Sequence, residues 1–174
     1  KKYIYYNAGV AYPNLFRGFF ERLYMELFNF LSNHSIKGDD EVISISKFLR
    51  DELKRETGID SKVKYVEVDK KRFHKGISGE MIRKKYKLDN KPVLLYVGRI
   101  SPHKGIHLLI KVFDKIKKEI PEASLIIVGK HTFPSYSRHL RKMADGSVIF
   151  AGFVDDTEIP YYYAAADVYV TCSL

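Results

Sequence analysis

The sequence is poor in cysteine: Cys172 is the only one among 174 residues. A disulfide within the chain and a zinc site built from cysteines are therefore excluded. The sequence also lacks an apolar run of about 18 residues, the length that a membrane-spanning helix needs, and it shows no signal peptide. Neither the Walker loop nor the dinucleotide-binding glycine pattern is present. We therefore expect a protein of a reducing, cytoplasmic compartment.

The sequence is rich in apolar and basic residues. Apolar residues make up 45% of it, enough for a buried core and too many for a disordered polar chain. Lys and Arg number 30 against 21 Asp and Glu, a net charge of +9. This excess favours an anionic partner, and nucleic acid, acidic lipid and a phosphate-bearing small molecule fit it equally well.

Residues 80–174 alternate between short apolar runs and segments with helical spacing. Apolar runs of three to five residues are typical of strands that are covered on both faces. Alternating strands and helices of this length form parallel βαβ units, so we predict an α/β, Rossmann-like parallel sheet with helices on both faces. The strands are expected at 93–97, 125–128, 148–151 and 168–170, with a helix at about 105–120.

The first 66 residues show the same alternation on a smaller scale. The strands are expected at 3–6, 41–46 and 62–66, and the helices at 13–31 and 47–57. In the second helix, Ser46 is placed as N-cap and Gly58 as C-terminal stop, with Phe48, Leu49 and Leu53 facing inward. The apolar face of helix 13–31 allows packing in a domain or burial in a membrane surface, and its mixed polar side favours packing.

The best candidate for a binding site is the turn that follows the strand 93–97, because ligands of open parallel sheets bind beyond the carboxyl ends of the strands. Gly98 allows a sharp turn, and Arg99 offers a fork of donors to phosphate oxygens. Lys104 adds a point charge, and Gly105 with the next amides forms the positive end of a helix. Together they predict a diphosphate site, with roughly 1.5–3 kcal/mol for each charge-assisted contact. A solvated basic loop is the alternative.

The segment 96–105, Tyr-Val-Gly-Arg-Ile-Ser-Pro-His-Lys-Gly, resembles the Gly-Arg…Lys-Gly loop of family 4 glycosyltransferases, which have the GT-B fold. The segment 148–154 fits the Val-x-Phe-x-Gly-x-Val pattern of that family. Other segments resemble further parts of such enzymes in the right order: 40–46, 68–73, 125–129 and 162–170.

The resemblance implies a retaining transferase that moves a sugar from a UDP- or GDP-sugar to a glycan or lipid-linked acceptor, with no metal ion or other cofactor. It assigns Arg99 and Lys104 to catalysis, as the groups that hold the diphosphate and stabilise it as it leaves. The residues of the diphosphate site are Gly98, Arg99, Lys104 and Gly105, and those implied for the nucleotide base are Gly129, Lys130, Phe153 and Val154.

The resemblance also implies a domain organisation. Residues 1–66 match the end of an acceptor-binding Rossmann-like domain, 67–79 an interdomain linker, and 80–174 the donor-binding domain. The chain is therefore expected to be a fragment of a two-domain enzyme and inactive alone. Three features of the family are missing: the two Glu eight positions apart that should follow Ser173, the Pro-Asn-Gly turn of the linker, and the acceptor-domain His expected near Asn7.

Other functions are weighed against the transferase. Within enzymes, a GT-B nucleotide-sugar epimerase or a phosphorylase-like enzyme is the nearest alternative. From another class, a nucleic-acid-binding module would use the basic cluster at 70–72 and 83–85, for which a solvated surface or a peripheral contact with the anionic inner face of a membrane is favoured; no nucleic acid is expected. His103, His107 and His131 lie near the predicted site without metal-ligand spacing, so no metal site is expected.

Overall fold

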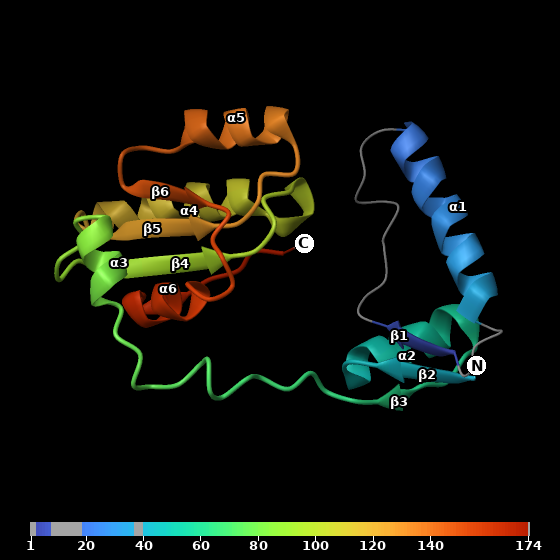
Figure 1. Ribbon diagram of the computed structural model, residues 1–174. Helices are drawn as coiled ribbons and strands as arrows, with labels where there is room; N and C mark the ends of the chain where they lie inside the picture. Colours follow the sequence, from blue (N-terminus) through green and yellow to red (C-terminus); the bar gives the residue numbers. More distant parts are fainter. Residues whose placement is uncertain (1–2, 8–18, 37–39, 174) are drawn as a thin grey trace. The chain divides into compact units, whose positions relative to one another are not determined.

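The computed structural model describes residues 3–7, 19–36 and 40–173. The chain divides into two compact units, Lys1–Val68 and Asp69–Leu174 (Figure 1). Among the described residues, no helix is both long enough and apolar enough to cross a bilayer.

The first unit contains a parallel sheet of three strands in the order β1-β2-β3. Helix α2 begins after Ser46, whose Oγ accepts the N–H of Leu49 at 3.2 Å, and ends at Gly58, which has a φ of 75°. Both predicted caps are thus confirmed. The elements are β1 (Ile4–Asn7), α1 (Phe19–Ile36), β2 (Glu41–Ser44), α2 (Lys47–Thr57) and β3 (Lys62–Val63).

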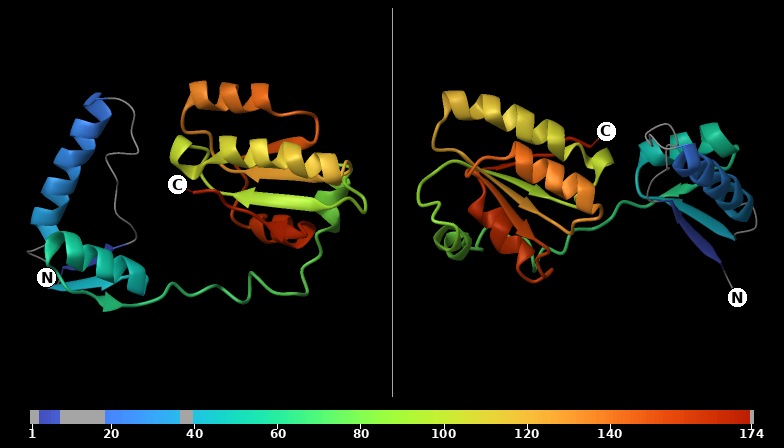
Figure 2. Two further views of the ribbon diagram at one scale, coloured as in Figure 1. Left: turned by 180° about the vertical axis from the view of Figure 1, so that it is seen from behind. Right: turned by 90° about the horizontal axis from the view of Figure 1, so that it is seen from above.

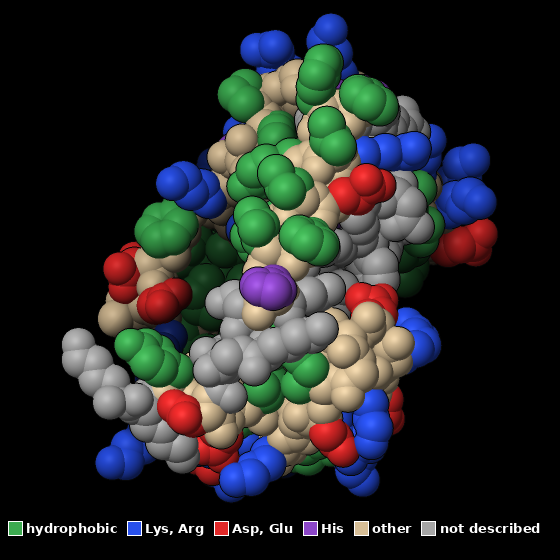
Figure 3. Space-filling view, turned by 90° about the vertical axis from the view of Figure 1, so that its right-hand side faces the viewer, with side chains coloured by type: hydrophobic (Ala, Val, Ile, Leu, Met, Phe, Trp, Pro, Cys, Tyr) green, Lys and Arg blue, Asp and Glu red, His purple; other side chains and the backbone are tan. Residues whose placement is uncertain are grey.

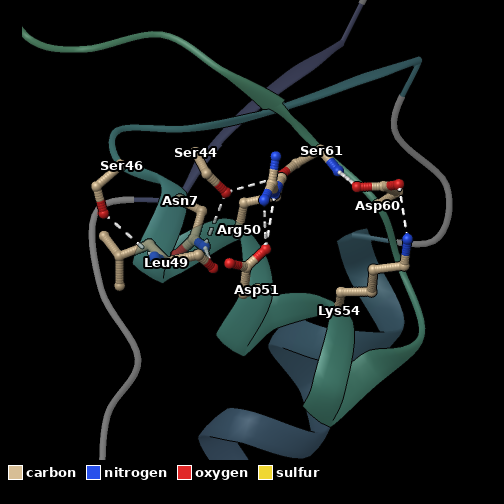
Figure 4. Close-up of polar contacts among 9 residues, drawn as sticks. All are labelled: Asn7, Ser44, Ser46, Leu49, Arg50, Asp51, Lys54, Asp60 and Ser61. Carbon is tan, nitrogen blue, oxygen red and sulfur yellow. Dashed lines mark hydrogen bonds and ion pairs between the residues drawn. The ribbon is translucent and has the colours of Figure 1, made fainter.

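Buried polar side chains tie the carboxyl ends of β1 and β2 to helix α2 and to the residue before β3. The Asn7 amide donates to Ser44 Oγ at 3.2 Å and to the Leu49 carbonyl at 3.0 Å (Figure 4). Ser44 Oγ in turn lies 2.6 Å from Ser61 Oγ. Because Asn7 and Ser44 are almost fully buried, these bonds hold the ends of β1 and β2 against α2 and the start of β3.

Several sequence predictions for this unit change. The strands predicted at 41–46 and 62–66 end at Ser44 and Val63. Phe48 is 70% exposed, so its inward placement was wrong. The inward side of α2 is set by Leu49 and Leu53, four residues apart, and Phe48 lies about 100° around the helix from Leu49. Helix α1 ends at Ile36 rather than at 31, and residues 13–18 of the predicted helix lie outside the described residues.

Helix α1 has large apolar side chains that the rest of its unit leaves exposed. Its large side chains are at least half exposed, from Phe28 at 50% to Phe20 at 82%, and Ile36 alone is buried among the side chains described there. Figure 3 shows hydrophobic side chains gathered over this helix. An apolar surface of this kind is typical of an interaction site. Packing within a domain and burial in a membrane surface both stay predictions.

The second unit is built on a four-stranded sheet in the order β6-β5-β4-β7, with every pair parallel. Helices α4 and α5 cover one face, and α3 and α6 cover the other (Figures 1 and 2). The predicted α/β sheet with helices on both faces is therefore confirmed. The elements are α3 (Glu80–Lys85), β4 (Val93–Val97), η2 (Pro102–Lys104), α4 (Ile106–Glu119), β5 (Ser124–Val128), α5 (Pro134–Met143), β6 (Val148–Gly152), α6 (Ile159–Ala165) and β7 (Val168–Tyr169).

The core of this unit lies in two layers, one on each face of the sheet. In β5, Leu125 and Ile127 pack on the side of α4 and α5, whereas Ile126 and Val128 pack on the side of α3 and α6. All four are buried, which explains why the strand is apolar without alternation.

Residues 69–79 are held against the second unit. The Asp69 carboxylate accepts the backbone N–H groups of Lys71 and Arg72, which closes a turn. The Arg72 guanidinium donates to the Asp156 carbonyl at 2.5 Å, and the Phe73 ring meets the ring of Tyr163 edge-on at 5.9 Å. The division between the units thus falls after Val68, near the start of the segment predicted as a linker.

Candidate diphosphate-binding site

The order of the strands reverses at β4. The strands β5 and β6 follow on one side of it, and β7 lies on the other. In open α/β sheets, the crevice outside the carboxyl ends of the strands at such a reversal is where ligands bind. The turn Gly98–Gly105 leaves β4 at this position, so the topology brings the predicted residues to the expected place.

Glycines end the three strands β4, β5 and β6 and bring their turns into contact. Gly98 donates its N–H to the Val128 carbonyl at 2.9 Å, and Gly129 donates to the Gly152 carbonyl at 2.8 Å. A Cβ on Gly129 would lie 1.8 Å from the carbonyl oxygen of Gly98. The turns after β4 and β5 are therefore packed backbone against backbone.

The first half of the turn after β4 is fixed by the turn after β5. Ile100 donates its N–H to the Lys130 carbonyl at 3.0 Å, and its own carbonyl accepts the N–H of Thr132 at 3.3 Å. The side chains of Ile100 and Ser101 are buried. Arg99, directly before them, is exposed, so its guanidinium is accessible on a backbone that these bonds fix.

Tyr96 holds the backbone of the same turn through its hydroxyl group. Its ring is buried, and its hydroxyl donates to the Arg99 carbonyl at 3.1 Å. Burial is the main reason that the pKa of Tyr96 rises to about 12. This role was not predicted from the sequence, although a tyrosine in an aliphatic strand is a signal, because a buried hydroxyl needs a partner.

The second half of the turn, residues 102–105, lies close to the segment that follows β7. Residues Pro102–Lys104 form one 3₁₀ turn, and Gly105 then adopts a φ of 65° where α4 begins. A Cβ on Gly105 would lie 2.0 Å from the Cys172 carbonyl oxygen. No pattern in the sequence indicated this approach between residues 67 positions apart. The approach places the backbone around Cys172 beside the predicted site.

The first amides of α4 are partly engaged within the protein. The N–H of Gly105 is donated to the Pro102 carbonyl at 3.0 Å. The Tyr136 hydroxyl, from α5, accepts the N–H of His107 at 3.2 Å and lies 2.9 Å from Nδ1 of that histidine. The sequence had assigned the amides after Gly105 to a bound anion, and Tyr136 occupies the one at His107.

The two predicted cations act on a common neighbour. Burial lowers the pKa of His103 below its ordinary value, and the positive charges of Lys104 and Arg99 lower it further. Lys104 is half-buried in the 3₁₀ turn, and Arg99, three residues before that turn begins, is exposed. A pair of positive charges therefore borders one short turn at the carboxyl edge of the sheet.

The histidines near this turn are paired with hydroxyl groups. Nδ1 of His131 lies 2.7 Å from Ser137 Oγ, and Nε2 of His103 lies 3.5 Å from Ser101 Oγ. Burial and the charge of Arg141 lower the pKa of His131. In the part of the chain that the structure describes, no three His, Cys, Asp or Glu side chains are grouped to hold a metal ion.

The residues predicted for the nucleotide base divide into two kinds. Phe153 is 74% exposed directly after β6, and Lys130 is exposed after β5. Val154 is buried in the core layer on the side of α3 and α6, so its side chain does not face a ligand. Gly129 lies in the contact between the turns described above.

A parallel α/β unit with two cations at its switch point is typical of domains that bind nucleotides or phosphate groups. Comparison with known proteins gives the family. The family pattern described as "Glycosyl transferases group 1" matches residues 78–174, and the chain belongs to that family.

Curated relatives match both units. The GDP-mannose-dependent alpha-(1-6)-phosphatidylinositol monomannoside mannosyltransferase of Mycobacterium tuberculosis is 30% identical over 140 residues, covering 76% of this chain and 36% of the relative. The alpha-monoglucosyldiacylglycerol synthase of Streptococcus pneumoniae is 28% identical over 152 residues, covering 82% and 29%. The chain thus spans about a third of the length of these relatives.

Solved structures share the fold. Anabaena Alr3699/HepE, in complex with UDP and glucose, superposes with a TM-score of 0.76 at 23% identity, covering 98% of this chain and 46% of that protein. Sucrose-phosphate synthase from Thermosynechococcus elongatus gives a TM-score of 0.70 at 21% identity, covering 95% and 43%. The chain therefore has the fold of GT-B glycosyltransferases and corresponds to less than half of each of these proteins.

Proposed function

We propose that the second unit binds the donor of a retaining, family 4 type glycosyltransferase, and that the donor is a UDP- or GDP-sugar. The observation that carries this proposal is the turn of Arg99 and Lys104 at the switch point of a group 1 family domain. The names of two relatives support the kind of substrate: one uses GDP-mannose, and HepE holds UDP and glucose.

In the proposed reaction, the diphosphate lies against the turn after β4. The Arg99 guanidinium and the Lys104 ammonium donate to its oxygens and stabilise the negative charge that grows as the bond to the sugar breaks. These two cations supply the charge, so the proposed site includes no metal ion or other cofactor. Retention of the anomeric configuration is proposed from the resemblance of the Gly-Arg…Lys-Gly turn alone.

The proposed acceptor is a glycan or a lipid-linked molecule. Two relatives are named for lipid products, a phosphatidylinositol mannoside and a glucosyldiacylglycerol. The proposed place of action is the cytoplasm or the inner face of a membrane. The basic cluster considered for nucleic acid gives little support to that alternative, because its members Arg83, Lys84 and Lys85 bind Asp167, Glu80 and the hydroxyl of Tyr162.

Nucleotide binding by the chain tests the proposal. Isothermal titration with UDP and GDP should show binding of at least one, weakened about 10- to 100-fold by Arg99→Ala or Lys104→Ala, as expected for the loss of one charge-assisted contact. Lys75→Ala and Arg138→Ala remove exposed cations elsewhere in the same unit and should leave the affinity within about twofold. Equal affinities in all four variants would refute the assignment of the diphosphate site.

A further inference from the structure

The outer side of α4 carries a row of lysines. Lys111, Lys115 and Lys118 are four and three positions apart, so they lie on one side of the helix, and all three are exposed. The opposite side of the helix, with Ile106, Leu109, Ile110 and Phe113, is buried in the core. Asp114 and Glu119 are also exposed on α4, yet neither forms an ion pair with these lysines in the described part of the chain.

Helix α5 continues this positive surface. It packs against α4 and lies on the same face of the sheet (Figures 1 and 2). Arg138 and Lys142, four residues apart, are exposed, and α5 has no acidic residue. None of the five cations Lys111, Lys115, Lys118, Arg138 and Lys142 has a hydrogen-bond or ion-pair partner among the described residues. We call these five the α4/α5 face.

The other basic cluster of the unit differs in this respect. Arg72 binds the Asp156 carbonyl, Arg83 binds Asp167, and Lys84 binds Glu80. At least half of that cluster therefore has partners within the fold. The five cations of the α4/α5 face have none among the described residues, and they outnumber the two exposed acidic residues of α4, Asp114 and Glu119. The linker docks on the side of α6, through Phe73 and Tyr163, so within this unit no described segment covers the α4/α5 face.

We propose that the α4/α5 face docks on the surface of an anionic lipid bilayer. Its charge is complementary to acidic headgroups, and two nearby helices of one face give an extended area for them. Leu108 and Val112, 36% and 50% exposed, lie beside the lysines on α4. Aliphatic side chains beside a row of lysines fit a lipid interface, into which they insert, whereas phosphate contacts of nucleic acids do not require them. The face lies outside the donor site, so docking and nucleotide binding are separate properties.

Co-sedimentation of the full chain with vesicles tests the docking. We expect binding to vesicles of phosphatidylglycerol and phosphatidylcholine and little to pure phosphatidylcholine. At roughly fivefold for each lysine, the triple variant K111Q/K115Q/K118Q should weaken the partitioning about 100-fold. The matched control K70Q/K71Q/K75Q removes the same charge from exposed lysines of the linker and should weaken it less than about fivefold. A triple Lys→Arg variant on α4 keeps the charge and should bind like the parent.

Each contrary result overturns the proposal. Equal losses in the two Gln variants would show that net charge alone acts, without a particular face. Equal binding to neutral vesicles would point to apolar insertion, for which α1 is the obvious element. Tighter binding of a single-stranded oligonucleotide, lost in K111Q/K115Q/K118Q, would assign the face to nucleic acid. Unchanged titration of UDP or GDP in that variant separates a failure of docking from a failure of the proposed function.

Discussion

The close approach of Gly105 to the Cys172 carbonyl predicts what an added methyl group does at this position. Gly105 and Gly152 both have left-handed φ values, 65° and 77°. A Cβ on Gly152 would have no atom within 4 Å, whereas one on Gly105 would meet the Cys172 oxygen at 2.0 Å. Gly152→Ala is therefore a matched control that contains the backbone strain without the collision.

Backbone strain and the steric collision together set the expected loss of stability. An alanine in the left-handed region costs about 1–2 kcal/mol, which is the whole effect for Gly152→Ala. At Gly105 the collision requires the backbone to move by about an ångström, an overpacking cost of about 1–3 kcal/mol more. Gly105→Ala should thus destabilise the second unit by about 2–5 kcal/mol in total.

Two measurements check this prediction. Hydrogen exchange of the buried strand β5 reports the opening of the second unit, and its rate in Gly105→Ala should exceed that in Gly152→Ala roughly 5- to 150-fold. Cys172 is the only thiol, so its labelling by a thiol reagent should also accelerate in Gly105→Ala alone, as the segment around it is displaced. If exchange and labelling are the same in both alanine variants, the Gly105–Cys172 contact is not present in the protein.

Two further predictions concern hydroxyl groups around the turn. Tyr136→Phe removes the acceptor of the His107 N–H and should destabilise the second unit by about 1 kcal/mol. The melting temperature should then fall by about 4 °C, and an unchanged value would show that the hydroxyl does not cap α4. The pKa of Tyr96 rises to about 12 on folding, so between pH 10 and 12 the unfolded chain loses a proton that the folded chain keeps, and stability falls as the pH rises. Urea unfolding in this range should show a shallower decline for Tyr96→Phe, and parallel curves for the two proteins would contradict the burial of that hydroxyl.

The strands and the helix caps could be predicted from the sequence because they depend on neighbouring residues. The apolar runs of β4 and β5 indicated strands covered on both faces, and the structure has helices on each side. Ser46 and Gly58 were assigned from the chemistry of helix ends, which involves at most four residues. Phe48 shows the limit: an apolar residue at the edge of a helix face points inward or outward according to the sheet beneath it.

The charged residues of the candidate site could be predicted from the sequence, whereas the hydroxyl groups that hold its backbone could not. Arg99 and Lys104 were assigned because they follow a buried strand, and the topology brings that turn to the carboxyl edge, as expected. The hydroxyls of Tyr96 and Tyr136 were missed, because each acts on a backbone group whose position depends on the tertiary fold. The α4/α5 face was missed for the same reason, since only the structure distinguishes its free cations from the paired ones at 83–85.

The groups that position the two cations of the proposed site carry no charge. Arg99 extends from a backbone fixed by the Tyr96 hydroxyl and by Ile100, which is bonded to the turn after β5. That turn approaches so closely that only glycine fits at Gly129, and the far end of the loop is closed by Gly105 in the same way. When a cationic side chain on a mobile loop binds a ligand, both the backbone and the side chain lose conformational freedom. When the backbone is already fixed, only the side chain does. The glycines of these turns should therefore matter to the proposed anion binding although they carry no charge, and a methyl group at Gly105 should weaken nucleotide affinity as well as stability.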